Sequence, residues 1–257
     1  MILETAFILR AVNYGESDRI YTLYTQGHGK LSAIAKAARK STKRFGGALQ
    51  PFAVFEVALT PSRRGSSNMY TIGEATMVAA NDGLSKNLSR LGIAAFLLEL
   101  LREVAPEHES SAPLFDVGKE ALALLSDTCQ LHERNLLLSA GMRILAQSGL
   151  AMSVGRCNAC GRPVPPGKPI YFDALRGGVV CTPCGGGPIL LDAQCAAAFR
   201  FLATHPIAES AALSIDPPVL DAMESAFIAF IHMHLEKQLK TPGFMSQISA
   251  RDRQDSE

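Results

Sequence analysis

The pattern of apolar and polar positions divides the chain near residue 80. Residues 1–80 contain five short runs rich in β-branched and aromatic residues, several of which alternate between apolar and polar positions, as strands do. Turn signals rich in Gly, Asn, Ser and Pro separate the runs. Five short strands in this length predict a small closed barrel, for which a five-stranded OB-fold has the best size. The predicted strands cover residues 7–12, 19–24, 30–35, 53–59 and 69–75.

After Asn81 the spacing of apolar residues becomes helical. It predicts helices over residues 88–101, 114–125, 133–147, 192–205 and 219–239. Gly149 is a suitable C-cap for the third of these helices. The expected architecture is therefore α+β and multidomain, with an OB-fold β-barrel in residues 1–80 and an α-helical domain in residues 81–257.

Residues 155–190 interrupt the helical half with eight Gly, six Pro and four Cys. The cysteines form two pairs, Cys157 with Cys160 and Cys181 with Cys184, and each pair encloses two residues. Two such turns can aim four thiolates at one point about 2.3 Å from each sulfur, as a tetrahedral zinc ion requires. The spacing predicts one structural Zn²⁺ per chain in a zinc-ribbon-like insertion, with short strands at 170–173 and 178–180. A site with four sulfur ligands has no open position for catalysis.

Other uses of these cysteines fit less well. Disulfides need an oxidising compartment, and the N-terminal residues do not form the charged and apolar regions of a signal peptide. A redox Cys-x-x-Cys motif usually begins a helix of a βαβ unit, which the local sequence does not predict. A dithiol oxidoreductase would be a metal-free protein. Cys129 and Cys195 lie in helical stretches, and we expect them to be buried thiols.

Charge distinguishes the two halves of the chain. Residues 1–80 carry ten Lys and Arg against five Asp and Glu, whereas the remainder is net negative. The densest basic segment is residues 36–44, and a second basic pair follows in the loop 61–67. Basic side chains of this kind contact phosphate groups. We therefore expect DNA contacts from seven residues: Lys36, Arg39, Lys40, Lys43, Arg44, Arg63 and Arg64.

Aromatic residues near the basic cluster could stack on nucleic-acid bases, as they do in OB-folds that bind single strands. The candidates are Tyr14, Tyr21, Tyr24, Phe45 and Tyr70. A small barrel also needs most of its aromatic residues for its core, and a solvated basic loop is common. The sequence alone therefore leaves the role of each aromatic residue open.

Catalytic and membrane functions find no support in the sequence. Gly27-His28-Gly29-Lys30 lacks the spacing of a phosphate-binding P-loop, and His232 and His234 are two residues apart, which places them on different sides of a helix. No apolar run reaches the length that spans a bilayer. We therefore expect a non-enzymatic cytoplasmic protein.

Several segments together resemble the bacterial recombination mediator family RecO over nearly the whole chain. The most specific are residues 14–18 (Tyr-Gly-Glu-Ser-Asp), 25–31, 36–44 and 47–52. The paired cysteines resemble the zinc insertion that some members of this family carry.

The resemblance implies an OB-fold followed by a helical domain, and binding and annealing of single- and double-stranded DNA. It implies RecR as a partner, a pocket for the C-terminal tail of single-strand-binding protein (SSB), indirect action on RecA in DNA repair, and association with the nucleoid. The alternative is a nucleic-acid-binding regulator in which the zinc ribbon itself touches DNA or RNA. Against it, the basic residues near the cysteines are few and dispersed: Arg156, Arg162, Lys168 and Arg176.

Overall fold

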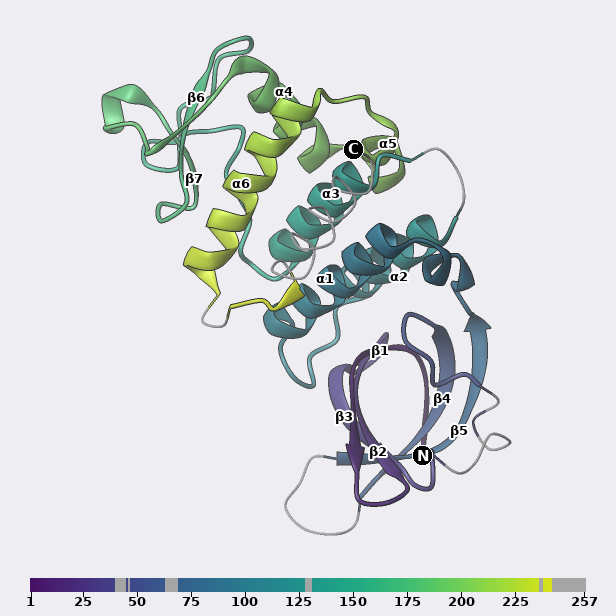
Figure 1. Ribbon diagram of the computed structural model, residues 1–257. Coiled ribbons are helices and arrows are strands. Elements are labelled where there is room, and N and C mark those ends of the chain that lie inside the picture. The colour runs from purple at the N-terminus through teal and green to yellow at the C-terminus, as the bar shows by residue number, and fades with distance from the viewer. Residues whose placement is uncertain (40–44, 46, 63–68, 128–130, 236–237, 242–257) are drawn as a thin grey trace. The chain divides into compact units, whose positions relative to one another are not determined.

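The computed structural model describes residues 1–39, 45, 47–62, 69–127, 131–235 and 238–241 (Figure 1). The chain forms two compact units, Met1–Thr128 and Cys129–Glu257. The predicted boundary near residue 80 lies inside the first unit, where strands give way to helices. Within the described residues, no helix is both long enough and apolar enough to cross a membrane.

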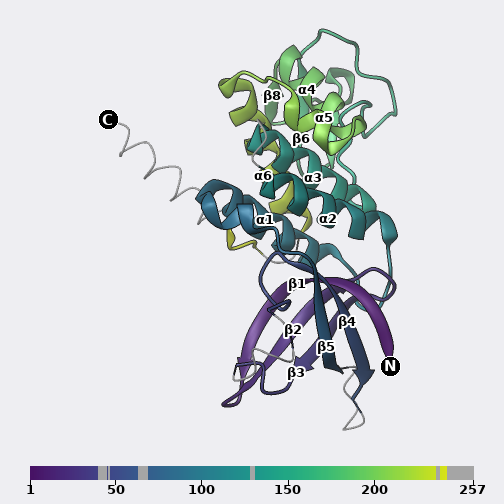
Figure 2. The ribbon, with the colours of Figure 1, turned by 90° about the vertical axis from the view of Figure 1, so that its right-hand side faces the viewer.

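The first unit begins with a closed five-stranded barrel, seen from the side in Figure 2. Its strands are β1 (Ile2–Tyr14), β2 (Asp18–Thr25), β3 (Gly29–Ala35), β4 (Val54–Pro61) and β5 (Met69–Ala79), in the order β1-β2-β3-β5-β4. Neighbouring strands are antiparallel except β3 and β5, which are parallel. All five predicted strands and the OB-fold-like barrel are thus confirmed.

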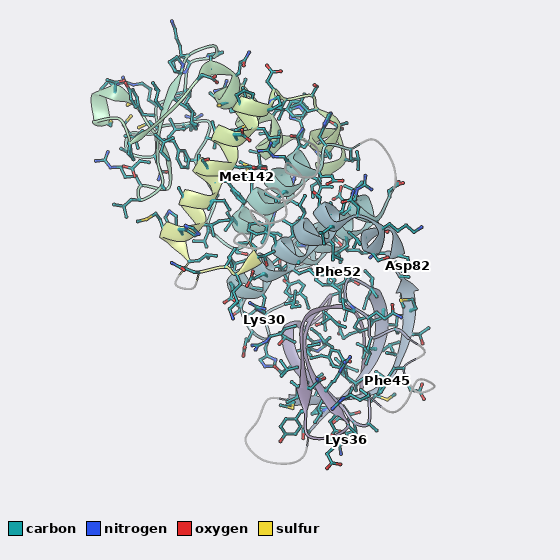
Figure 3. All side chains as sticks on the ribbon, viewed as in Figure 1. Lys30, Lys36, Phe45, Phe52, Asp82 and Met142 are labelled. Carbon is teal, nitrogen blue, oxygen red and sulfur yellow. The ribbon has the colours of Figure 1, made fainter. Side chains whose placement is uncertain are left out.

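Alternation of side chains builds the barrel core. Along β3, Leu31, Ala33 and Ala35 are buried, whereas the residues between them are half-buried. This period of two is the one that a strand imposes. Phe45, from the connection between β3 and β4, is also buried in this core (Figure 3).

Two helices cover one outer side of the barrel: α1 (Leu88–Val104) and α2 (Ala112–Ser126), preceded by the 3₁₀ helix η1 (Asp82–Lys86). The Phe7 ring of β1 stacks on Phe115 of α2, with ring centroids 5.3 Å apart. Helix α2 comes so close that a Cβ atom on Gly118 would lie 2.7 Å from Phe7 Cζ. Tyr24 joins the same stack and is fully buried. The outer side of the barrel is therefore apolar where these helices cover it.

The second unit contains the helices α3 (Glu133–Gln147), α4 (Ala193–Thr204), α5 (Ile207–Ala212) and α6 (Pro217–His234). Helices α3 and α6 are joined by Arg134, whose Nε and Nη2 atoms donate to Glu224 at 2.7 and 2.6 Å. These hydrogen bonds raise the pKa of Arg134 further above its ordinary value. All five predicted helices are present in the chain, three of them (α3, α4 and α6) in this unit, and Gly149 follows α3 with a φ of 82°. The short helix α5 was not predicted, and α6 ends five residues before the expected Leu239.

A small three-stranded sheet interrupts these helices in sequence. It consists of β6 (Ile170–Asp173), β7 (Gly178–Val180) and β8 (Ile189–Leu191), in the order β7-β6-β8. Strands β6 and β7 have the predicted bounds, whereas β8 was not predicted. The 3₁₀ helix η2 (Thr182–Cys184) lies between β7 and β8, with Cys181 of the second cysteine pair as its N-cap and Cys184 as its last residue.

Candidate nucleic-acid interface and metal centre

The four predicted cysteines come together at one point. Their sulfur atoms all lie within 4.8 Å of one another, and Cys160 Sγ lies 3.8 Å from Cys181 Sγ. Four sulfurs at about 2.3 Å from one ion form a tetrahedron with edges of about 3.8 Å. The cluster is therefore compatible with a single metal ion.

Each cysteine pair lies on a tight turn that ends in a left-handed glycine. Gly161 follows the first pair with a φ of 72°, and Gly185 follows the second with a φ of 99°. The Gly161 amide donates to the Cys157 carbonyl, and the Gly185 amide donates to the carbonyl of Thr182. Residues other than glycine adopt this conformation at a cost. Gly161 and Gly185 therefore allow the backbone to turn sharply after the last cysteine of each pair.

The cluster favours thiolate at its most buried member. The Cys181 amide donates to Cys157 Sγ at 3.3 Å, and this hydrogen bond lowers the pKa of the Cys157 thiol to about 6. Hydrogen bonds from Cys184 to the Cys181 and Cys160 sulfurs raise the pKa of Cys184 to about 12. Four crowded sulfurs cannot all ionise at neutral pH without a cation between them. A divalent ion at the centre would remove that repulsion.

Two of the four basic residues around the cysteines contact the cysteine turns. Arg156 Nη1 donates to the Gly161 carbonyl at 3.2 Å. Arg176 Nη1 donates to the Cys184 carbonyl at 3.0 Å, and its Nε lies 3.5 Å from Asp173 Oδ2. These guanidinium groups therefore satisfy backbone carbonyls of the site.

Helix α6 anchors the sheet that carries the cysteines. His234 Nε2, at the end of α6, lies 2.8 Å from the Ala174 carbonyl in the turn between β6 and β7. The same ring packs against Phe230, with centroids 4.3 Å apart. His234 thus has a structural partner. Cys195 is buried at the start of α4, as predicted, whereas Cys129 lies outside the described residues.

The basic cluster, residues 36–44, begins directly after the last residue of β3, Ala35. Lys36 and Arg39 are both exposed. Figure 3 shows Lys36 at the end of the barrel opposite Lys30, whose amine donates to the Arg102 carbonyl of α1. The other predicted DNA-contacting residues lie outside the described part of the chain: Lys40, Lys43, Arg44, Arg63 and Arg64.

The turn between β1 and β2 holds the start of the basic cluster. Asp18 Oδ1 accepts the Ala37 amide at 2.8 Å. The Arg39 amide donates to the Ser17 carbonyl at 3.0 Å, and Arg39 Nη1 donates to the Glu16 carbonyl at 3.1 Å. Residues 36–39 are therefore fixed to the strand hairpin at three points.

Only some aromatic candidates are accessible to a ligand. Tyr21, Tyr24 and Phe45 are at most 4% exposed, so these three belong to the interior and cannot stack on bases. Tyr70 is half-buried. Tyr14, at the end of β1, is 57% exposed.

Strand register extends the basic cluster across the outer face of β1, β2 and β3. Arg10, Val12 and Tyr14 alternate along β1, and all three are exposed. Val12 pairs with Ile20 of β2, which in turn pairs with Ile34 of β3, and both isoleucines are partly exposed. We call these five residues, with Lys36 and Arg39, the strand face. Arg10 was not among the predicted DNA contacts, although its alternation with Val12 and Tyr14 could have indicated it.

Comparison with known proteins gives the same family over both units. Residues 1–81 match the model of the recombination protein O N-terminal domain, and residues 85–242 match that of its C-terminal domain. The chain belongs to the RecO family. A DNA repair protein RecO from Anaeromyxobacter sp. (strain Fw109-5) is 36% identical over 249 residues, which are 95% of each chain.

Other RecO proteins match over a similar span. The DNA repair protein RecO of Myxococcus xanthus (strain DK1622) is 35% identical over 246 residues, covering 95% of this chain and 97% of the relative. That of Desulfatibacillum aliphaticivorans is 27% identical over 257 residues. The resemblance inferred from the sequence motifs is therefore confirmed, and the chain is a DNA repair protein of this family.

Proposed function

We propose that this RecO-family chain is a non-enzymatic recombination mediator that binds single- and double-stranded DNA and anneals complementary strands. It acts with RecR to help RecA load onto DNA coated with SSB, whose C-terminal tail it binds. Membership of the RecO family supports the proposal of these partners and of a cytoplasmic, nucleoid-associated location. The seven predicted basic residues, together with Arg10, supply the phosphate contacts.

The observation that carries the DNA-binding proposal is the composition of the strand face. OB-folds bind oligonucleotides on strands 2 and 3 and on the loops between strands 1 and 2 and between strands 4 and 5. Here Val12 and Tyr14 offer exposed apolar and aromatic surface, flanked by Arg10 and Lys36. Bases stack on such surface while basic side chains follow the phosphates. In this chain the loop between β4 and β5 also contains Arg63 and Arg64.

Annealing on this face needs no chemical step. Two complementary strands repel each other through their phosphates, and Lys and Arg side chains reduce that repulsion by replacing the counterions. Bases held on an exposed surface can then pair. The proposed activity therefore does not depend on nucleotide hydrolysis.

A strand-annealing assay without ATP tests the proposal. We expect the full chain to accelerate annealing, and a variant with Lys36, Arg39, Lys40, Lys43 and Arg44 all replaced by Ala to lose most of that acceleration. Replacing Arg162 and Lys168 in the second unit serves as a matched control. Equal annealing by the wild type and the five-residue variant would contradict the proposed surface.

We propose that the four cysteines hold one structural Zn²⁺ ion. The observation that supports zinc is the four-sulfur donor set with tetrahedral spacing, since soft thiolate ligands select zinc over harder divalent ions. Cys157, Cys160, Cys181 and Cys184 would all be ligands, and the ion would stabilise the fold of the insertion.

The alternative, in which the ribbon itself binds nucleic acid, has less support from the geometry. All four basic residues of the insertion are exposed, but Arg156 and Arg176 donate to carbonyls of the cysteine turns, so Arg162 and Lys168 can be changed without disturbing those contacts. Charge reversal at these two positions separates the proposals. The mediator proposal predicts almost unchanged DNA affinity, whereas the ribbon alternative predicts a large loss.

A further inference from the structure

The turn between β1 and β2 places an acidic side chain beside the basic cluster. Asp18 lies at the start of β2, and its Oδ1 accepts hydrogen bonds from the Ala37 amide at 2.8 Å and the Ser17 hydroxyl at 3.2 Å. A negative charge next to a surface that binds phosphates weakens binding by simple electrostatics. Its presence here therefore needs another explanation.

The backbone of Ala37 supplies that explanation. Its φ is +57°, in the left-handed region that residues with a Cβ atom seldom adopt. Ala37 is exposed, so packing does not force this conformation. The hydrogen bond from its amide to Asp18 offsets the cost and keeps the turn between Lys36 and Arg39 in one shape.

We propose that Asp18 is a positioning residue for DNA binding, which holds Lys36 and Arg39 in their binding geometry by fixing the left-handed turn at Ala37. The proposal rests on the proposed function, because it assumes that these two basic residues contact phosphates. Its consequence has an unusual sign: removing this acidic side chain weakens binding to a polyanion.

The first test measures the affinity of the full chain for single-stranded DNA at fixed salt. We expect Asp18→Ala to weaken binding by about five- to tenfold, the change that follows when the competent turn falls to about one tenth to one fifth of the population. Glu16→Gln is the matched control for charge, because Glu16 contributes its backbone carbonyl to Arg39 and the substitution leaves that carbonyl in place. This control should bind DNA as well as the wild type or better.

Two further substitutions separate hydrogen bonding from charge. Asp18→Asn keeps a side-chain oxygen that can accept the Ala37 amide but removes the charge, so it should bind at least as tightly as the wild type. Ala37→Gly, which adopts positive φ without strain, should restore most of the affinity when combined with Asp18→Ala. A general loss of stability would not be repaired by a glycine at an exposed turn.

A variant that leaves Asp18 intact keeps the test decisive if Asp18→Ala proves unstable. Ala37→Val disfavours the left-handed conformation through its branched side chain, and it should weaken binding as Asp18→Ala does. Thermal unfolding of each variant checks the fold.

The outcomes distinguish this proposal from the proposed function. Equal or tighter binding by Asp18→Ala or Ala37→Val overturns the positioning role if Lys36→Ala with Arg39→Ala still weakens binding. No effect from that basic pair would instead contradict the assumption that they contact DNA.

Discussion

At the scale of single residues, exposure decides which side chains can meet a ligand. Five aromatic residues near the basic cluster were equal candidates in the sequence, but three of them are buried. Tyr21 faces the barrel core, and Tyr24 packs against Phe115 of α2. Tyr14 is the exposed one.

Replacing Tyr14 with Ala should weaken binding of single-stranded DNA by about 1–3 kcal/mol, the contribution of one stacked base. Tyr14→Phe keeps the aromatic ring and should bind almost normally. A fluorescence anisotropy titration with labelled oligonucleotides measures both variants. Wild-type affinity in Tyr14→Ala would show that this ring does not stack on bases.

The cluster of four cysteines was the residue-level feature that the sequence predicted best. The spacing of the cysteines within each pair is local in sequence, so the two Cys-x₂-Cys pairs predicted the ligand set directly from the sequence. The role of Asp18 could not be predicted in this way, because it depends on a contact between residues 19 positions apart. Arg10 was also missed, although its alternation with Val12 and Tyr14 along β1 could have indicated it.

At the scale of elements, alternation and helical spacing gave the barrel strands and the long helices. The missed elements, α5 and β8, have six and three residues, too few to show a period. Helix α6 ends at His234, where the imidazole contacts the turn between β6 and β7. Local periodicity does not include such tertiary contacts.

The barrel needs its covering helix. Phe7 and Tyr24 are fully buried and stack on Phe115 of α2, so a fragment ending at residue 80 would expose both rings to water. We expect residues 1–127 to unfold cooperatively, and residues 1–80 to unfold at a lower temperature and to aggregate.

A single substitution in the whole chain gives the same information. Phe115→Ala should lower the free energy of unfolding by about 3–5 kcal/mol, as large-to-small changes of buried aromatic residues do. Urea denaturation followed by circular dichroism measures this. An unchanged midpoint would contradict the packing role of α2.

The cysteine cluster should stabilise the insertion and not the DNA-binding surface. We expect elemental analysis to find one zinc per chain, and Cys157→Ser to reduce metal content and the thermal stability of the second unit. Structural zinc contributes on the order of 10 kcal/mol of apparent folding free energy in small zinc domains. DNA affinity of the first unit should be nearly unchanged. Purified protein with no metal would contradict the zinc proposal and favour a dithiol function.

At the scale of the whole molecule, charge separates the two halves. Residues 1–80 have twice as many basic as acidic residues, whereas the rest of the chain has an acidic excess. This asymmetry supports our proposal that the first unit binds DNA. The pocket for the SSB tail that the resemblance implies for the helical domain could not be placed on named residues, because a protein-binding pocket has no fixed spacing of residue types.

The most direct test of the central claim is the salt dependence of DNA binding by the intact chain. Each phosphate contact on single-stranded DNA contributes about −0.7 to the slope of log K against log salt, so five contacts contribute about −3.5. Replacing Lys36, Arg39, Lys40, Lys43 and Arg44 with Ala should therefore make the slope shallower by about 3.5 and weaken binding. The same slope in the wild type and in this variant would contradict the claim that the basic cluster binds the phosphates.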